Sequence, residues 1–331
     1  MTITKEFIPL LTGIDLSTRQ LPLLIADSGK AGPTVWITAA IHGDEVTGTA
    51  IIQSLFSRFK KKALIAGKVY AVPILNPSGF ERISRREAFT DADLNRHFNG
   101  RAFGSTPERI AAGILSAVLA TKPDYVIDIH TDSINSIPYT LVDVPKTLKN
   151  RKTLEKSVTI AQTLGFPWAL DTEKSAGYPP EQCFTGRLQT EGVPAITIEI
   201  GWPCVIVDDY RRMGVNAIWE VFEALGMVEG EKKLISTIPT DVNTFTERLA
   251  TQSTGIIAYE VKPGDAVKEG QVLGRVRNVF GEQIEVLPSP VDGRIFSHED
   301  QSVTFPGLAL FTLVVSSDFE KVLLNVRDKM A

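Results

Sequence analysis

The stretch TVWITAAIHGDEVTGTAIIQSLFSRFK, residues 34–60, decides the fold class. Residues 34–41 are mostly apolar and partly β-branched, which is typical of a buried strand. Residues 46–60 place apolar side chains at helical spacing and end in basic residues, so they predict a helix. Between the two, His-Gly-Asp-Glu interrupts the apolar pattern. A buried strand, a polar turn and a helix together form the repeating unit of an α/β fold.

Strand-like and helix-like segments continue to alternate along the first two thirds of the chain. Further strands are predicted at 21–26, in KVYAVPILNPSGF (68–80), in YVIDIH (125–130) and at 194–201. Further helices are predicted at 106–120, with Thr106 as N-cap and Pro107 after it, at 151–164 and at 208–226. This pattern predicts an α/β fold with a mixed, mostly parallel sheet flanked by helices.

The pattern of predicted secondary structure changes near residue 240. From 253 to 315, short alternating segments are separated by turns such as KPGD, KEGQ and FPG, which predicts an all-β region. We therefore expect a large α/β domain at 1–240, a small β domain at 250–316 and a C-terminal helix or tail at 317–331.

Composition limits the classes of partner. The 331 residues are 43% hydrophobic and 22% charged, with a formal net charge of −4, so no basic excess indicates a nucleic-acid surface. The N-terminus lacks the pattern of a signal peptide, and no apolar run is long enough to span a membrane. Two cysteines do not form a disulfide framework, so we expect a cytoplasmic protein.

Imidazole and carboxylate groups stand at the ends of three separate predicted strands. His42 and Glu45 follow the first strand, His130 ends another and Glu199 lies within ITIEI. The carboxyl ends of strands in an open α/β sheet are where ligands bind. Two histidines and one glutamate form a catalytic zinc set, with zinc lowering the pKa of its water to about 7. Alone, the H-x-x-E spacing is a weak signal; the three strand ends together predict one zinc ion on His42, Glu45 and His130.

Glu199 allows two interpretations. Its neighbours are apolar or small, and a buried carboxylate without a partner is costly. It could pair with an arginine elsewhere in the chain, or it could be a general base beside the metal, with its pKa raised by the apolar surroundings. Asp128, two residues before His130, is a candidate to orient that histidine.

The segment from Arg85 to His97 supplies further donors. Asn95 and Arg96 are adjacent in DADLNRHF, and Arg85 and Arg86 lie just upstream. An arginine fork matches a carboxylate, and positioned donors can stabilise a developing oxyanion. The alternative is an ordinary solvated basic loop, which fits one of the Arg85–Arg86 pair.

The motifs HGDE, NPSGF with DADLNRHF, IDIHT and TIEIG, in this order, resemble the succinylglutamate desuccinylase/aspartoacylase family of the zinc carboxypeptidase superfamily. The resemblance implies a zinc carboxypeptidase-like fold and zinc on His42, Glu45 and His130. It also implies that Glu199 activates water and later protonates the departing amine, and that Asn95 and Arg96 bind the substrate carboxylate.

The same resemblance implies an arginine that polarises the scissile carbonyl. Its position ten residues before the asparagine selects Arg85, but the segment RREAFTDADLNR departs from the pattern of relatives, so Arg86 stays an alternative. The implied reaction is hydrolysis of an N-acyl amino acid to a carboxylate and a free amine.

The C-terminal segment resembles a lipoyl/biotinyl-type barrel-sandwich hybrid, with PGD-V-EGQ-LG and SP-DG as its turns. A carrier domain needs a lysine at the exposed hairpin tip, whereas this chain reads NVFGEQ there. We therefore expect a structural domain or a partial lid over the catalytic site. Tyr259 is a candidate to reach the substrate pocket, with simple packing as the alternative.

Three functions remain open at this stage. The sequence favours a deacylase acting on a small N-acyl amino acid; the alternatives are a metallocarboxypeptidase and a binding protein that has lost the chemistry. The substrate pocket is expected to involve residues 131–140 and 172–187. The acyl group, the amino acid and the oligomeric state, with a homo-oligomer as one option, are left open.

Overall fold

One large mixed sheet runs through the computed structural model, which describes residues 1–13, 15–235, 237–246 and 249–327. The strand order is β1-β2-β4-β3-β5-β8-β6-β7-β9-β17-β15-β12, with β10 also paired to β17. Its strands are β1 (Thr2–Thr12), β2 (Thr18–Asp27), β3 (Thr34–Ala39), β4 (Lys68–Val72), β5 (Tyr125–His130), β6 (Tyr139–Asp143), β7 (Trp168–Asp171), β8 (Ala195–Glu199), β9 (Asp241–Phe245), β10 (Leu249–Ala250), β12 (Ala266–Val267), β15 (Gly293–His298) and β17 (Ala309–Asp318). The predicted mixed α/β fold is confirmed, but the prediction of a mostly parallel sheet is wrong. Parallel pairing is confined to β4-β3-β5-β8 and β6-β7-β9, and the other strand pairs of this sheet are antiparallel, because hairpins and the C-terminal strands extend it at both ends.

Helices cover both faces of the central strands. The helices are α1 (Thr47–Phe59), α2 (Pro77–Glu81), α3 (Thr106–Ala120), α4 (Arg151–Leu164), α5 (Glu173–Ala176), α6 (Phe184–Thr190), α7 (Asp208–Ala224) and α8 (Phe319–Arg327), with short 3-10 turns η1 (Leu94–Arg96) and η2 (Pro180–Gln182). Alternate residues of each strand face opposite sides, so Ile127 packs with α1, α4 and α7, whereas Val126 packs with α3 and α6. Strands that are apolar on both faces account for the near-continuous hydrophobic runs in the sequence.

Helix α3 begins differently from the sequence prediction. Its N-cap is Ser105 and not Thr106, which lies in the first turn together with Pro107. The Ser105 hydroxyl and backbone N–H both contact the Glu108 carboxylate, forming a capping box. The prediction missed this box because Thr-Pro is itself a good helix start.

Several strands lacked a clear sequence signal. Strand β1 pairs with β2 at the edge of the sheet and is mostly exposed, so its pattern is weakly apolar. Strand β7, only four residues long, lies in the region rich in proline and glycine after residue 165. At the C-terminus, β17 continues through Asp318, so the expected helix from 317 begins at Phe319.

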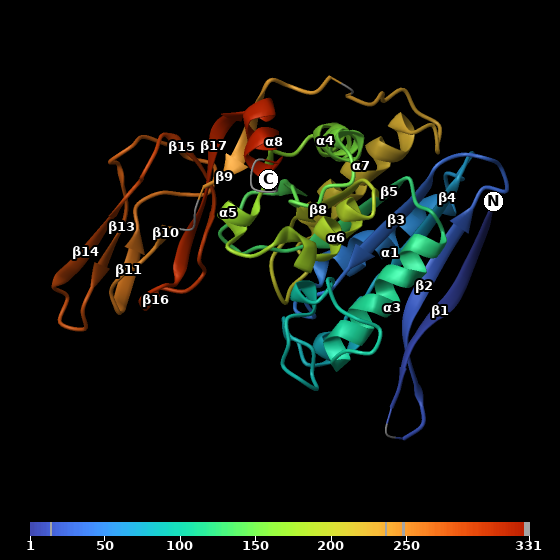
Figure 1. Cartoon of the computed structure of the whole chain (residues 1–331), viewed down its shortest axis with the longest axis horizontal. Helices are drawn as coiled ribbons and strands as arrows, with labels where there is room; N and C mark the ends of the chain where they lie inside the picture. The colour runs from blue at the N-terminus through green and yellow to red at the C-terminus, as the bar shows by residue number, and fades with distance from the viewer. Residues whose placement is uncertain (14, 236, 247–248, 328–331) are drawn as a thin grey trace.

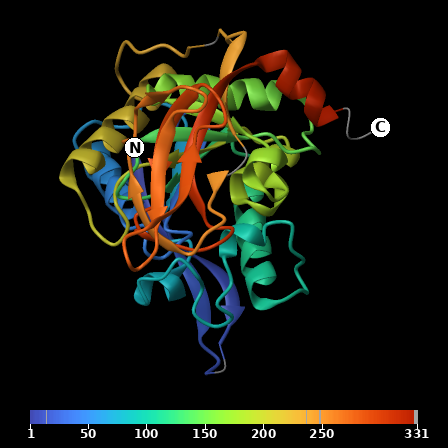
Figure 2. The ribbon, with the colours of Figure 1, turned by 90° about the vertical axis from the view of Figure 1, so that its left-hand side faces the viewer.

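The C-terminal strands form a second core. A four-stranded sheet, made of β14 (Gln283–Pro288), β13 (Val272–Arg277), β11 (Gly255–Tyr259) and β16 (Val303–Thr304), shares a hydrophobic cluster with β15 and β17. Figure 1 places these strands at the opposite end of the molecule from the β1–β2 hairpin, and in Figure 2 they face the viewer. Strand β9 pairs with both β7 and β17, so the large sheet continues from the α/β part into this region.

None of the helices in the described part of the chain combines the length and the apolar character required to cross a membrane.

The turn after β3 requires a glycine. Ala40 adopts a positive φ of 53°, which turns the chain out of the strand. Gly43 then passes against helix α2, with its N–H donating to the Ser84 carbonyl at 2.9 Å. A Cβ at this position would lie 2.0 Å from the carbonyl carbon of Gly79. Only glycine fits this close approach of two backbones.

We predict that Gly43→Ala displaces the turn or α2 and lowers the free energy of unfolding by about 2 kcal/mol or more. Urea denaturation provides the measurement. The matched control is Gly113→Ala in α3, where the new Cβ meets only the flexible end of Leu10. That control is expected to keep or slightly raise stability. Equal unfolding midpoints for Gly43→Ala and the parent chain would contradict the prediction.

Candidate active site

The three side chains predicted as metal ligands lie close together at the carboxyl ends of β3 and β5. His42 and Glu45 lie on the turn after β3, and His130 is the last residue of β5. All three are buried, and their ligand atoms lie within 4.8 Å of one another. One Glu45 oxygen is 2.6 Å from His42 Nδ1, and the other is 2.9 Å from His130 Nδ1. The three residues could therefore hold a metal ion, as a His₂Glu set requires.

The outer nitrogens of both imidazoles contact carboxylates. His130 Nε2 lies 2.8 Å from Asp128 Oδ2, as the sequence suggested, and Asp128 also accepts a hydrogen bond from Thr38. His42 Nε2 lies 3.2 Å from Asp93 Oδ1. A carboxylate at Nε2 favours the tautomer that carries its proton there. The Nδ1 lone pairs are then directed toward Glu45, which fits the donor set of a metal site.

Asp93 is a site residue that the sequence analysis missed, although it stands within the quoted DADLNR motif. Its carboxylate contacts His42, forms an ion pair with Arg85 at 2.9 Å and accepts the N–H of Asn95. Burial alone raises the pKa of Asp93, but the hydrogen bond with His42 and the Arg85 guanidinium outweigh it and hold the pKa well below its usual range. One carboxylate thus positions three polar residues of the site.

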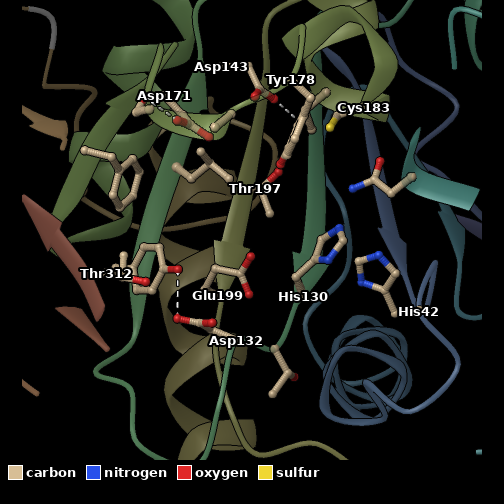
Figure 3. Close-up of a pocket in the computed structure, with 18 of the residues that line it drawn as sticks. His42, His130, Asp132, Asp143, Asp171, Tyr178, Cys183, Thr197, Glu199 and Thr312 are labelled. Carbon is tan, nitrogen blue, oxygen red and sulfur yellow. Dashed lines mark hydrogen bonds between the residues drawn. The ribbon is translucent and has the colours of Figure 1, made fainter. Parts of the chain in front are cut away.

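Glu199 ends β8 in register with His130 on β5 and with Tyr139 on β6. Figure 3 shows its carboxylate directed into the same cavity as His130. Among the described residues, Oε2 has no hydrogen-bond partner and no lysine or arginine lies within 4 Å of the carboxylate, so the alternative of an arginine ion pair is not realised. Burial raises the pKa of Glu199 to about 8, opposed by the charge of His130.

Among the described residues, no carboxylate lies within 4 Å of the Arg96 guanidinium, which is held by other contacts. Its Nη1 donates to the Asn95 carbonyl at 2.8 Å and to Cys183 Sγ at 3.3 Å, and its guanidinium lies 3.9 Å from the centre of the Tyr178 ring. The Asn95 side-chain oxygen accepts the N–H of Phe184, which leaves the Asn95 amide NH₂ as a donor. Both residues line the pocket.

The two neighbouring arginines have different surroundings. Arg85 lines the pocket, with Nη1 3.1 Å from His42 Nδ1 and 3.6 Å from Glu45 Oε1. Arg86 is exposed, donates to the backbone carbonyl of Asp91 at 2.7 Å and is absent from the pocket wall. The structure therefore does not bring Arg86 to the site, and it corresponds to the solvated member of the pair.

The cavity that contains these groups has a volume of about 250 Å³ and extends over the sheet face beyond Glu199. The expected segments 131–140 and 172–187 contribute, among others, Tyr139 and Tyr178. Two carboxylates at its far end, Asp143 and Asp171, were not anticipated. Strand β17 adds Phe311, Thr312 and Leu313 to the wall, so the C-terminal region does reach the pocket.

Two other candidates lie outside this cavity. Tyr259 stacks on His298 with ring centres 4.0 Å apart, and its hydroxyl donates to the Gln301 carbonyl, so packing explains it. Asp44, whose role was open, does not cap α1 with its side chain. Instead its backbone carbonyl accepts the N–H of Cys204, which ties the turn after β3 to the segment after β8.

The model of the succinylglutamate desuccinylase/aspartoacylase catalytic domain matches residues 31–210, more than half of the chain. The chain belongs to this family. That match spans the turn after β3, the DADLNR motif, β5 and β8, which carry the site described above.

Individual proteins extend the comparison. The chain is 26% identical over 260 residues to the N-alpha-acetyl-L-2,4-diaminobutyric acid deacetylase of Halomonas elongata, covering 77% of this chain and 73% of that protein. A succinylglutamate desuccinylase structure from Silicibacter superposes with a TM-score of 0.78 at 19% identity, covering 95% of both chains. A product-bound structure of the ectoine utilization protein EutE from Ruegeria pomeroyi gives 0.78 at 20% identity, with the same coverage. These structural matches establish a shared fold.

We predict that Asp128→Asn weakens zinc binding by about 10- to 100-fold, because His130 loses the charged acceptor that orients it and raises its basicity. Competition with a chromophoric chelator measures the affinity. The control is Asp124→Asn, which removes a carboxylate just before the opposite end of β5, where it accepts the N–H of Thr34. Unchanged zinc affinity in Asp128→Asn would show that this carboxylate does not support the metal site.

Proposed function

We propose that this chain is a zinc-dependent deacylase that hydrolyses the amide bond of a small N-acyl amino acid. The observation that carries the proposal is one cavity holding the His42–Glu45–His130 set, the unpartnered carboxylate oxygen of Glu199 and the guanidinium of Arg96. Family membership supports a hydrolase, and the relative from Halomonas elongata is named as a deacetylase of an N-acetyl amino acid.

His42, Glu45 and His130 would hold one zinc ion per chain through two Nδ1 atoms and a carboxylate oxygen. When bound, zinc supplies Lewis-acid polarisation of the scissile carbonyl and of the attacking water. Asp128 and Asp93 keep the Nδ1 lone pairs available by holding a proton on each Nε2.

In this proposal Glu199 moves the protons. Its carboxylate takes a proton from the attacking water and passes it to the nitrogen of the departing amine. Burial raises the pKa of Glu199, which favours the protonated carboxyl that donates to the departing amine. The missing hydrogen-bond partner of Oε2 leaves that atom available to the water.

Arginine and asparagine donors orient the substrate. Arg96 binds the substrate carboxylate, aided by the Asn95 amide, because its guanidinium is held in place without a protein carboxylate within 4 Å among the described residues. Arg85 polarises the scissile carbonyl from beside His42, and it takes this role instead of Arg86.

The same centre would serve a metallocarboxypeptidase, but the shape of the pocket favours a small substrate. Its volume of about 250 Å³ lies below the range of roughly 300–1,000 Å³ typical of drug-sized ligands. Phe311 and Leu313 of β17 and Phe245 of β9 form part of the wall and limit the room for a peptide. The third alternative, an inactive binding protein, would not need Glu199 beside the metal set.

The first test separates metal binding from chemistry. Glu199→Gln is expected to bind one zinc per chain like the parent protein, yet to lose turnover of N-acetyl amino acids by at least about 10³-fold. The parent protein should lose activity with a chelator and regain it with zinc. Zinc content by elemental analysis and release of free amine are the measurements. Normal turnover in Glu199→Gln, or chelator-resistant activity, would overturn the proposal.

The second test concerns substrate binding. Arg96→Ala is expected to raise KM for N-acetyl amino acids by about 10²-fold, because a charge-assisted contact to the carboxylate is lost. Arg86→Ala is the matched control: it removes the same charge outside the pocket and should leave both kcat and KM unchanged. An unaltered KM in Arg96→Ala would remove Arg96 from carboxylate recognition.

A further inference from the structure

We propose that Asp132 is a positioning residue of the active site. By accepting a hydrogen bond from the Tyr139 hydroxyl, it keeps that hydroxyl from donating to Glu199 and leaves the Glu199 carboxylate free to react. This inference rests on the proposed deacylase function, in which Glu199 takes a proton from the attacking water. It adds a residue that acts on Glu199 through a neighbouring side chain.

Tyr139 is placed where it could donate a hydrogen bond to Glu199. The two residues pair directly across the antiparallel strands β6 and β8, so their side chains stand on the same face of the sheet. Both line the pocket. Burial raises the pKa of Tyr139 well above its usual range, and the charges of Asp132 and Glu199 add to this shift, so both carboxylates lie near the phenol.

In the structure the hydroxyl of Tyr139 donates to Asp132 instead. The Tyr139 oxygen lies 3.1 Å from Asp132 Oδ2. Among the described residues, the buried Oε2 of Glu199 has no hydrogen-bond partner. A tyrosine has a single O–H to donate, so a full hydrogen bond to Asp132 excludes one to Glu199. Figure 3 shows Asp132 and Glu199 as neighbouring carboxylates in the pocket.

The ring of Tyr139 is held in place independently of this hydrogen bond. It packs against Phe245 of β9 and Phe296 of β15, with the ring centres 5.9 and 5.1 Å from its own. The three rings share one hydrophobic cluster. Removal of the Asp132 carboxylate would therefore leave the ring where it is and free only the hydroxyl, whose hydrogen can rotate toward another acceptor.

The loop that carries Asp132 is anchored by the C-terminal β region. Asp300 accepts hydrogen bonds from the backbone N–H groups of Ile134 and Asn135, at 3.1 and 3.2 Å. The Asn135 carbonyl accepts the N–H of His298 at 3.1 Å. None of these hydrogen bonds involves the Asp132 side chain, so we expect the loop to keep its position when that side chain is replaced.

A hydrogen bond from Tyr139 would occupy the base of the proposed reaction. Hydrogen bonds to a charged carboxylate are among the stronger ones in proteins. Such a bond would have to break before the Glu199 oxygen could take a proton from water. The cost would fall on the chemical step and not on substrate binding, which the proposed function assigns to Arg96 and Asn95.

The test removes first the acceptor and then the donor. In zinc-loaded Asp132→Ala, we expect kcat for N-acetyl amino acids to fall about 10- to 100-fold, while KM changes by less than about 3-fold. Adding Tyr139→Phe removes the competing donor and should raise kcat of the Asp132→Ala protein about 10-fold or more. Asp132→Asn keeps an acceptor oxygen and should retain a higher kcat than Asp132→Ala.

The matched control is Tyr259→Phe, added to the Asp132→Ala protein. It removes a hydroxyl that donates to the Gln301 carbonyl outside the pocket, and it should not restore kcat. If Asp132 only supported the loop, Tyr139→Phe would not restore kcat either, because a second substitution does not repair a displaced loop. No gain from Tyr139→Phe, or an equal gain from Tyr259→Phe, would overturn the proposal.

A crystal structure of zinc-loaded Asp132→Ala gives a readout that does not depend on turnover. The Tyr139 oxygen is expected within about 3 Å of a Glu199 carboxylate oxygen. A longer separation, without a hydrogen bond, would contradict the proposal. Asp132→Leu, which has the same branching without an acceptor, is the second variant if Asp132→Ala does not fold.

The outcomes separate the two proposals. If the parent protein hydrolyses no N-acyl amino acid, the deacylase function fails, and the distance between Tyr139 and Glu199 still tests the role of Asp132. If the parent protein is active and Asp132→Ala keeps its kcat, the positioning role fails and the deacylase function stands.

Discussion

The site depends on one buried carboxylate shared by two imidazoles. Glu45 lies between His42 and His130, with one oxygen toward each Nδ1. Burial opposes the charge of Glu45, but the two histidines outweigh it and hold its pKa well below the usual range. The N–H of Thr131 adds a further donor to the same carboxylate. A buried carboxylate is tolerated in the protein interior only when its hydrogen-bond partners are held in fixed positions.

The sheet supplies that rigidity. The central strands β3, β5 and β8 are apolar on both faces and pack between two helical layers, so the residues at their ends have little freedom. The carboxylates of Asp128 and Asp93 then fix the two rings, and Asp93 also fixes Arg85. The candidate metal ligands and the proposed substrate donors are thereby built on elements that do not need to move.

The cavity beside these residues is lined by both basic and acidic side chains. The Arg96 guanidinium contacts the Tyr178 ring and the Cys183 thiol, and at the far end the Asp143 and Asp171 carboxylates accept hydrogen bonds from hydroxyl groups. The C-terminal strand β17 completes the wall, so the second core also shapes the pocket.

The sequence by itself determined the α/β class and the family, and it predicted the metal-ligand set, because these depend on local periodicity and on short motifs such as H-x-x-E and DADLNR. It also selected Glu199, whose apolar neighbours marked a buried carboxylate. Only the tertiary structure placed Arg85, and not Arg86, in the pocket wall, and only it placed Asp93 beside His42. Likewise, no local pattern pairs Asp143 with Asp171, since they lie in different strands whose register is set by packing across the whole sheet.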